Sequence, residues 1–111
     1  MLFRSGALEG VVAGKPPYMA WEVEVRSIEE LTVALEFNPT IVMLDNFSDT
    51  GIRDAMSILS AASHRPMVEA SGGVRPERLA TLKGLGVDAV SAGFLTTHAP
   101  NVDISMRVSA L

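Results

Sequence analysis

The chain repeats one pattern about every 22 residues, in which a short strand-forming run ends near a polar side chain and an amphipathic helix follows. The four polar side chains are Glu24, Asp45, Glu69 and Ser91, at intervals of 21, 24 and 22 residues. This spacing leaves room for one strand and one helix per repeat. It predicts an α/β fold with a parallel sheet, whose right-handed crossovers place the carboxyl ends of all strands at one edge.

The strands are predicted from alternating or continuous apolar runs at 20–26, 41–45, 67–70 and 87–92. The run at 41–45 is apolar until its last residue, so we expect that strand to be buried on both faces. Near the end of the chain, Ile104, Met106 and Val108 alternate with polar residues and indicate a candidate short last strand.

The helices are predicted between these strands from capping residues and breakers. Ser27 and Glu30 have capping-box spacing, and the helix that they begin runs to Asn38-Pro39. Ser48 or Asp49 caps a second helix, which Pro66 stops. A third begins near Pro76, has Leu79 and Leu82 pointing inward, and ends at Gly84 and Gly86; Leu8, Val11 and Val12 suggest a weak helix before the first strand.

Length limits how much of a barrel these units can form. A complete (β/α)₈ barrel needs about 250 residues, and this chain has 111 residues with no linker that divides it. We therefore expect residues 1–111 to form one partial barrel domain, about half of a TIM-like barrel. Such a half-barrel is a fragment, closes by pairing with another copy, or forms an open sheet whose exposed edges need a cover. The uncovered edges predict self-association.

Charge and composition exclude several classes of protein. Nine Lys and Arg residues against thirteen Asp and Glu give a net charge of −4, so we expect no nucleic-acid partner. The chain has no cysteine, which removes disulfides and thiolate zinc sites and is compatible with a cytoplasmic location. No apolar run approaches the roughly 18 residues of a membrane span, so we expect no membrane association.

The polar residues at the predicted sheet edge favour a sugar-phosphate site. Glu24 and Asp45 end neighbouring strands, where a carboxylate needs a cation, a hydroxyl or a basic partner. Ser71, Gly72 and Gly73 lie between a strand and a helix, where backbone N–H groups bind anions, and Ser91 and Gly93 offer a second such turn. Carboxylates for hydroxyls beside glycine-rich turns for a phosphate are the groups that such a ligand requires.

Structural interpretations of the same residues remain open. A strand-end acid is often a helix cap or an ion-pair partner, and a lone S-G-G is often only a turn. His64 is expected to be solvated, whereas His98 follows the fourth strand and is a candidate to line the site. Arg26, Arg75 and Arg78 are expected on the surface, and of the three only Arg75 lies where an anion would meet it.

Five linked motifs occur in a fixed order along the chain: W-E-V-E-V-R-S-I-E-E, I-V-M-L-D-N-F-S, V-E-A-S-G-G-V, G-V-D-A-V-S-A-G-F-L-T and A-P-N-V-D-I-S-M. In their order and spacing they resemble the C-terminal part of the quinolinate phosphoribosyltransferase family, over residues 6 to 108. The resemblance implies a pentosyltransferase of NAD biosynthesis that converts quinolinate and phosphoribosyl pyrophosphate, with Mg²⁺, to nicotinate mononucleotide, pyrophosphate and CO₂. It also implies a homo-oligomer.

The resemblance assigns roles to particular residues. It implies that Glu24 and Asp45 are catalytic, contacting the ribose hydroxyls and assisting the Mg²⁺-bound pyrophosphate. It implies that the 5′-phosphate is held by the two turns, at Ser71, Gly72, Gly73, Ser91 and Gly93. Asn46, Glu69 and His98 are further candidates for the site. Family members commonly read L-T-H-S where this chain has Leu95-Thr96-Thr97-His98, so the histidine is displaced by one position.

The resemblance also implies that several functional parts lie outside the matching region. These are the N-terminal domain, the early barrel strands, the K-D-N-H lysine and the basic residues that clamp the quinolinate carboxylates. We therefore expect the isolated chain to be inactive. Two alternatives are a non-catalytic half-barrel that binds phosphate or self-associates, and the pyrophosphorylase-like protein associated with molybdate transport, although A-S-G-G and E-V-R-S-I-E-E fit quinolinate enzymes better.

Overall fold

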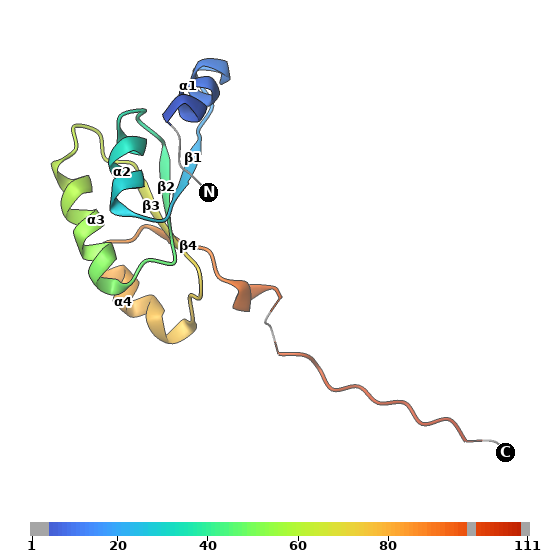
Figure 1. The fold of residues 1–111 in the computed structure, drawn as a ribbon. Coiled ribbons are helices and arrows are strands. Elements are labelled where there is room, and N and C mark those ends of the chain that lie inside the picture. Colours follow the sequence, from blue (N-terminus) through green and yellow to red (C-terminus); the bar gives the residue numbers. More distant parts are fainter. Residues whose placement is uncertain (1–4, 98–99, 110–111) are drawn as a thin grey trace.

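The protein is one four-stranded parallel sheet with its helices alternating along the chain (Figure 1). The computed structural model describes residues 5–97 and 100–109. The strands are adjacent in sequence order, β1-β2-β3-β4. Their bounds are Glu22–Val25 (β1), Ile41–Asp45 (β2), Met67–Ser71 (β3) and Ala89–Val90 (β4), and the helices are Ser5–Gly14 (α1), Ile28–Leu35 (α2), Asp49–Ala61 (α3) and Leu79–Gly84 (α4).

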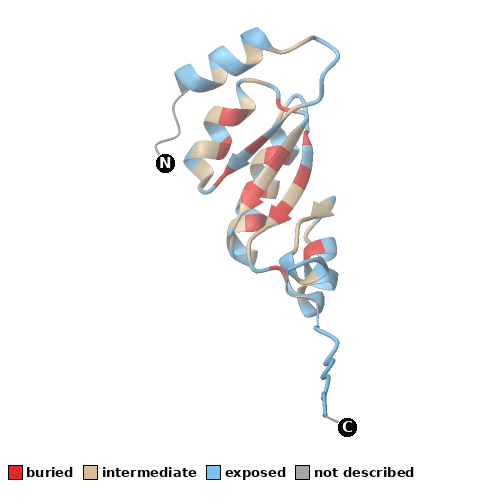
Figure 2. Cartoon of the chain, turned by 90° about the vertical axis from the view of Figure 1, so that its right-hand side faces the viewer, coloured by how far each residue is buried: buried red, intermediate tan, exposed pale blue. Residues whose placement is uncertain are grey.

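One face of the sheet carries the apolar core. Strand residues such as Val25, Leu44 and Val68 are fully or almost fully buried against Leu31 of α2 and Leu59 of α3. Figure 2 shows these buried positions as alternating bands along the strands. Because successive strand residues point to opposite faces, the other face carries the intervening residues.

The other face of the sheet is only partly buried. This corrects the expectation that the strand at 41–45 is buried on both faces. In β2, Val42 and Leu44 are buried, whereas Ile41, Met43 and Asp45 are partly exposed. A continuous apolar run indicates burial on both faces only when both faces have a covering layer. Here the helices cover one face, and the other remains open.

The predicted caps begin the helices. Ser27 Oγ accepts a hydrogen bond from Glu30 N, and the Glu30 carboxylate accepts one from Arg26 N, one residue earlier than in a standard capping box. Of the two candidate caps for α3, the structure uses Ser48, whose Oγ accepts from Gly51 N. Helix α3 ends at Ala61, before Pro66. Hence local sequence determines where both helices begin.

The fourth repeat is shorter than predicted. Strand β4 contains only Ala89 and Val90. Just before it, the Asp88 carboxylate, rather than a backbone carbonyl, accepts the hydrogen bond from Val68 N at 2.8 Å. Arg65 Nη2 lies 3.1 Å from the same carboxylate oxygen. Helix α4 is preceded by a 3₁₀ turn at Pro76–Arg78, and Leu79 is 37% exposed rather than inward, while Leu82 is buried as predicted.

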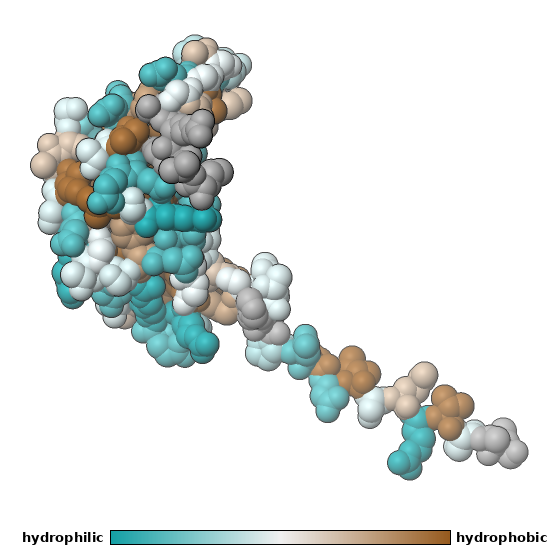
Figure 3. All heavy atoms as spheres, viewed as in Figure 1, coloured by the Kyte–Doolittle hydropathy of each residue, from teal (hydrophilic) through white to brown (hydrophobic). Residues whose placement is uncertain are grey.

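The prediction of a short last strand at 104–108 is wrong. Residues 100–109 are extended without strand pairing and project away from the sheet (Figure 1). Ile104, Met106 and Val108 are 84%, 87% and 83% exposed, and Figure 3 shows apolar and polar residues alternating along this segment. Alternation forms a strand only beside a free sheet edge, and within the described residues none lies next to this segment.

The longest helix described in residues 5–97 and 100–109 is α3, and none of the helices there is long and apolar enough to cross a membrane.

Candidate functional site

The open face of the sheet presents two rows of polar residues near its carboxyl edge. In the strand register Asp45 pairs with Ser71, and Val25 with Leu44, so Arg26 comes next to Asp45. Two residues earlier, Glu24 and Glu69 both pair with Met43. The four polar residues that define the sequence repeat therefore share a face but occupy two levels.

Arg26 joins the two predicted catalytic carboxylates. Its Nη2 lies 2.8 Å from Glu24 Oε1, and its Nε lies 3.1 Å from both Glu24 Oε1 and Asp45 Oδ2. The hydrogen bonds that Arg26 donates to Glu24, together with the negative charges of Glu24 and Asp45, raise the pKa of Arg26 above its usual value. The structure thus brings Glu24 and Asp45 together through a cation that was expected to be a plain surface residue.

A second group lies across the sheet from β1 to β4. Ser91 Oγ donates a hydrogen bond to Glu69 Oε1. Partial desolvation, a hydrogen bond with Glu69, and repulsion from Glu69 and Glu24 raise the pKa of Glu22 above its ordinary value. Glu22 was not predicted as a site residue, although its alternation with Glu24 and Arg26 along β1 places all three on one face.

The turn after β2 packs tightly on the turn after β3. Asn46 has a φ of 59° and donates its backbone N–H to Ser71 O at 2.9 Å, while its Nδ2 donates to Asp45 Oδ1 at 3.3 Å. A Cβ at Gly72 would lie 2.9 Å from Asn46 N and would overlap the Asn46 side chain. Gly72 therefore permits a close approach between two loops, and Asn46 contacts both Asp45 and Gly72.

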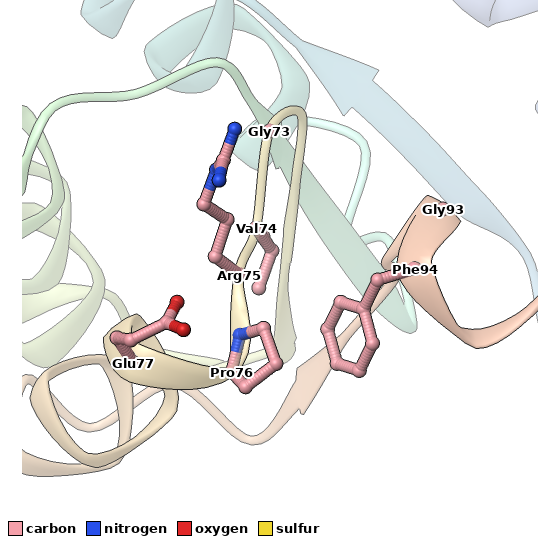
Figure 4. A pocket seen from close by; sticks show the side chains of 7 residues that line it. All are labelled: Gly73, Val74, Arg75, Pro76, Glu77, Gly93 and Phe94. Carbon is pink, nitrogen blue, oxygen red and sulfur yellow. The ribbon is translucent and has the colours of Figure 1, made fainter. Parts of the chain in front are cut away.

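A hollow of about 360 Å³ lies where the turns after β3 and β4 meet (Figure 4). It brings together Gly73 and Gly93, which were predicted to hold a phosphate, with Arg75 and Phe94. In Figure 4 the Phe94 ring lies beside Pro76, and the Arg75 side chain runs along the loop that carries Gly73. A Cβ at Gly73 would meet nothing within 4 Å, so the backbone here is open to a ligand.

Not every predicted residue lines this hollow. Ser71 and Gly72 lie beside it in the chain, but Ser91 donates its N–H to Ala70 O and its hydroxyl to Glu69. Among the described residues, the lining includes none from β1 or β2, so the carboxylates of Glu24 and Asp45 form a separate part of the site. His98 lies outside the described residues, and His64 is exposed, as expected.

Within the described residues, no group of three or more His, Asp or Glu side chains is arranged to hold a metal ion by itself. Glu24 and Asp45, on neighbouring strands, each use one carboxylate oxygen to pair with Arg26, which leaves the second oxygen of each as a donor to a metal ion. Mg²⁺ is commonly held by one or two carboxylates together with substrate phosphates and water. This donor set therefore fits a magnesium ion that arrives with a phosphorylated ligand.

The carboxyl edge of the sheet combines two kinds of group: carboxylates that accept hydrogen bonds, and glycine-rich turns whose backbone N–H groups can bind an anion. Glu24 and Asp45 supply carboxylate oxygens that accept hydrogen bonds from hydroxyl groups, while the hollow supplies glycine backbone, the Arg75 guanidinium and the Glu77 carboxylate. The glycine backbone and Arg75 suit an anion at the Gly73 and Gly93 side of the hollow, and the carboxylates of Glu24 and Asp45 suit a neutral polyol or a cation.

Comparison with known proteins identifies the family. The sequence model of the quinolinate phosphoribosyl transferase C-terminal domain matches residues 7–107. The chain belongs to this family. The resemblance inferred from the five motifs is confirmed, and with it the α/β fold of parallel strand–helix units.

Relatives within this family carry one enzyme name. The probable nicotinate-nucleotide pyrophosphorylase (carboxylating) of Archaeoglobus fulgidus is 36% identical over 107 residues, covering 94% of this chain and 42% of that protein. The nicotinate-nucleotide pyrophosphorylase (carboxylating) of Homo sapiens is 36% identical over 89 residues, covering 80% and 30%. The chain therefore spans less than half the length of these relatives.

Solved structures agree on the fold. The nicotinate-nucleotide pyrophosphorylase from Francisella tularensis has a TM-score of 0.74 at 32% identity, covering 91% of this chain and 35% of that one. NadC from Streptococcus pyogenes has a TM-score of 0.75 at 32% identity, covering 94% and 35%. In the family, this chain therefore corresponds to a partial barrel.

Proposed function

We propose that this chain is the phosphoribosyl-binding part of a carboxylating nicotinate-nucleotide pyrophosphorylase. In the reaction, the quinolinate ring nitrogen would form a bond to C1 of phosphoribosyl pyrophosphate as pyrophosphate leaves. One ring carboxylate would then leave as CO₂, and a proton from water would take its place on the ring carbon, giving nicotinate mononucleotide. The names of the relatives support this choice over the molybdate-associated alternative. The observation that carries the proposal is that two predicted phosphate turns meet in one hollow at the sheet edge that also bears Glu24 and Asp45.

The hollow would take the 5′-phosphate. Gly73 and Gly93 allow close approach to the backbone, and Arg75 supplies the positive charge. Phosphate bound there would be fixed by a rigid turn, because Gly72 is locked against Asn46. Binding energy from this remote group would then orient the ribose for reaction.

Glu24 and Asp45 would accept hydrogen bonds from the ribose hydroxyls. As the bond from C1 to pyrophosphate breaks, positive charge develops on the ribose, and two nearby carboxylates would stabilise it. Magnesium carried in with phosphoribosyl pyrophosphate would neutralise the departing phosphates, with Glu24 and Asp45 as its protein ligands.

The test is isothermal titration calorimetry of the 111-residue chain with three ligands in turn: inorganic phosphate, ribose 5-phosphate, and phosphoribosyl pyrophosphate together with Mg²⁺. Asp45→Asn keeps the side-chain shape and removes its charge. We expect it to leave phosphate affinity within about twofold and to weaken ribose 5-phosphate by about tenfold, which corresponds to one charge-assisted hydrogen bond.

Asp54→Asn on the exposed side of α3 is the matched control and should change none of the three affinities. Equal weakening of all three ligands by Asp45→Asn would make Asp45 a structural residue and refute its proposed role. Absence of any preference for ribose 5-phosphate over phosphate in the wild type would refute the proposed function.

We further propose that the functional protein is a homo-oligomer acting on small molecules. Its phosphorylated substrates do not cross membranes unaided, which favours a cytoplasmic reaction. The open sheet face and the two sheet edges support association of the chain with further protein surface.

A further inference from the structure

Arg26 lies at the centre of the carboxylate part of the site. It follows β1 directly, and strand alternation puts it on the same face as Glu24, two residues earlier. Its Nε and Nη2 both bond Glu24 Oε1, and Nε also bonds Asp45 Oδ2 on the neighbouring strand. One guanidinium therefore joins two carboxylates that come from different strands.

Without that guanidinium the two carboxylates would repel each other across the sheet. Asp45 is the more confined of the two, with a side chain only 15% exposed, so it has little freedom to turn into water. Arginine suits this position because its planar group donates several hydrogen bonds in fixed directions, whereas lysine is a compact point charge. Arg26 thus sets both the spacing and the orientation of Glu24 and Asp45.

The bonding leaves acceptors available on both acids. Arg26 uses one oxygen of each carboxylate. Within the described residues, no hydrogen bond reaches Glu24 Oε2, and Asp45 Oδ1 receives only the long 3.3 Å contact from Asn46 Nδ2. Each acid therefore retains an oxygen that can accept from a hydroxyl group.

From this geometry we propose that Arg26 is a positioning residue, which holds the carboxylates of Glu24 and Asp45 so that their remaining oxygens accept from two neighbouring hydroxyls of a ribosyl ligand. The inference rests on the proposed function and adds a residue to it. Arg26 acts here through the two carboxylates, while the phosphate is held at the hollow, which Arg26 does not line.

The first experiment compares wild type, Arg26→Gln and Arg26→Lys for binding of ribose 5-phosphate and of inorganic phosphate. Arg26→Gln should weaken ribose 5-phosphate by about tenfold and leave phosphate within about twofold. Arg26→Lys should restore only part of the lost preference, because it keeps the charge without the planar group. Arg53→Gln, an exposed residue on α3, is the matched control and should behave as wild type.

The second experiment observes the side chain itself. In the ligand-free protein, the Nε–H resonance of Arg26 should shift in Glu24→Gln and in Asp45→Asn, and should stay unchanged in Asp54→Asn. An Nε–H resonance of Arg26 that has the same chemical shift in wild type, Glu24→Gln and Asp45→Asn would overturn the proposed contact.

The outcomes separate the two proposals. If the wild type prefers ribose 5-phosphate and Arg26→Gln keeps that preference, the role of Arg26 is wrong and the proposed function stands. Tighter binding of ribose 5-phosphate by Arg26→Gln would show that Arg26 competes with the ligand, which also overturns the inference. If the wild type has no such preference, the proposed function fails and the role of Arg26 fails with it.

Discussion

At the scale of single residues, Gly72 and Gly73 are adjacent glycines with different constraints. Both have positive φ values, 87° and 59°, but only Gly72 lies against Asn46. Gly72→Ala should therefore lower the free energy of unfolding by roughly 2–4 kcal/mol, which combines overpacking with backbone strain. Gly73→Ala should cost only the strain, about 1 kcal/mol.

Urea unfolding of the two variants gives this comparison directly. The Gly72→Ala defect should shrink in an Asn46→Gly background, because the overlapping side chain is then absent. Equal costs for the two alanine variants would mean that the approach of the Asn46 loop to Gly72 does not limit stability.

Glu22 supplies a dependence of stability on pH. Its pKa is raised in the folded protein, mainly by partial desolvation and then by Glu69, so the folded state binds the proton more tightly than the unfolded chain. Stability from this group is complete below the ordinary glutamate pKa and is lost as pH rises through the raised value. Glu22→Gln removes the titrating group, so its stability relative to wild type should improve as the pH rises above the ordinary glutamate pKa of about 4.

Chemical denaturation at several pH values measures this difference. Glu77→Gln, an exposed glutamate that bonds no described residue, is the control and should follow the wild-type profile across this range. If the free energy of unfolding of Glu22→Gln differs from that of wild type by the same amount at every pH, Glu22 is not the source of the pH dependence.

Arg26 shows what sequence alone leaves out at this scale. The alternation of Glu22, Glu24 and Arg26 predicts a shared face, and the repeat predicts that Asp45 lies at the same edge. Which charged groups pair depends on the register between β1 and β2, and the repeat spacing gives that register only to within a residue or two. For the same reason, the repeat spacing does not predict that Glu24 and Glu69 lie two residues before the level of Asp45 in the sheet.

At the scale of elements, the best predictions rest on local chemistry. The caps at Ser27 and Ser48 and the alternation in β1 act within a few residues, so the sequence contains the complete signal. Strand β4 is shorter than predicted, and at its start the Asp88 side chain takes the hydrogen bond of Val68 N, a partner 20 residues away that the local pattern does not reveal. The apolar alternation at 104–108 was misleading for a related reason: strand formation needs a neighbouring edge that the segment itself does not specify.

At the scale of the whole molecule, the open sheet face predicts self-association. Met67 is 49% exposed on this face, beside half-buried Ile41. Covering such side chains is favourable by roughly 25 cal/mol per Å² of apolar area, so a second copy that packs there would be stabilised. Sedimentation equilibrium should show a reversible dimer or larger assembly, which Met67→Lys weakens.

Ser57→Lys, on an exposed position of α3, adds the same charge away from the open face and should leave the association unchanged. A chain that stays monomeric over a wide concentration range and still melts cooperatively would contradict the prediction.

The sequential order of the strands also bears on how the molecule is made. Each strand pairs with the one synthesised immediately before it, so every native pairing closes a segment of only one strand and one helix. Short closures have low entropic cost and favour fast folding. The four described strands can therefore pair one after another while the chain is still emerging from the ribosome, and the two-residue β4 should exchange its amide protons sooner than the central strand β2.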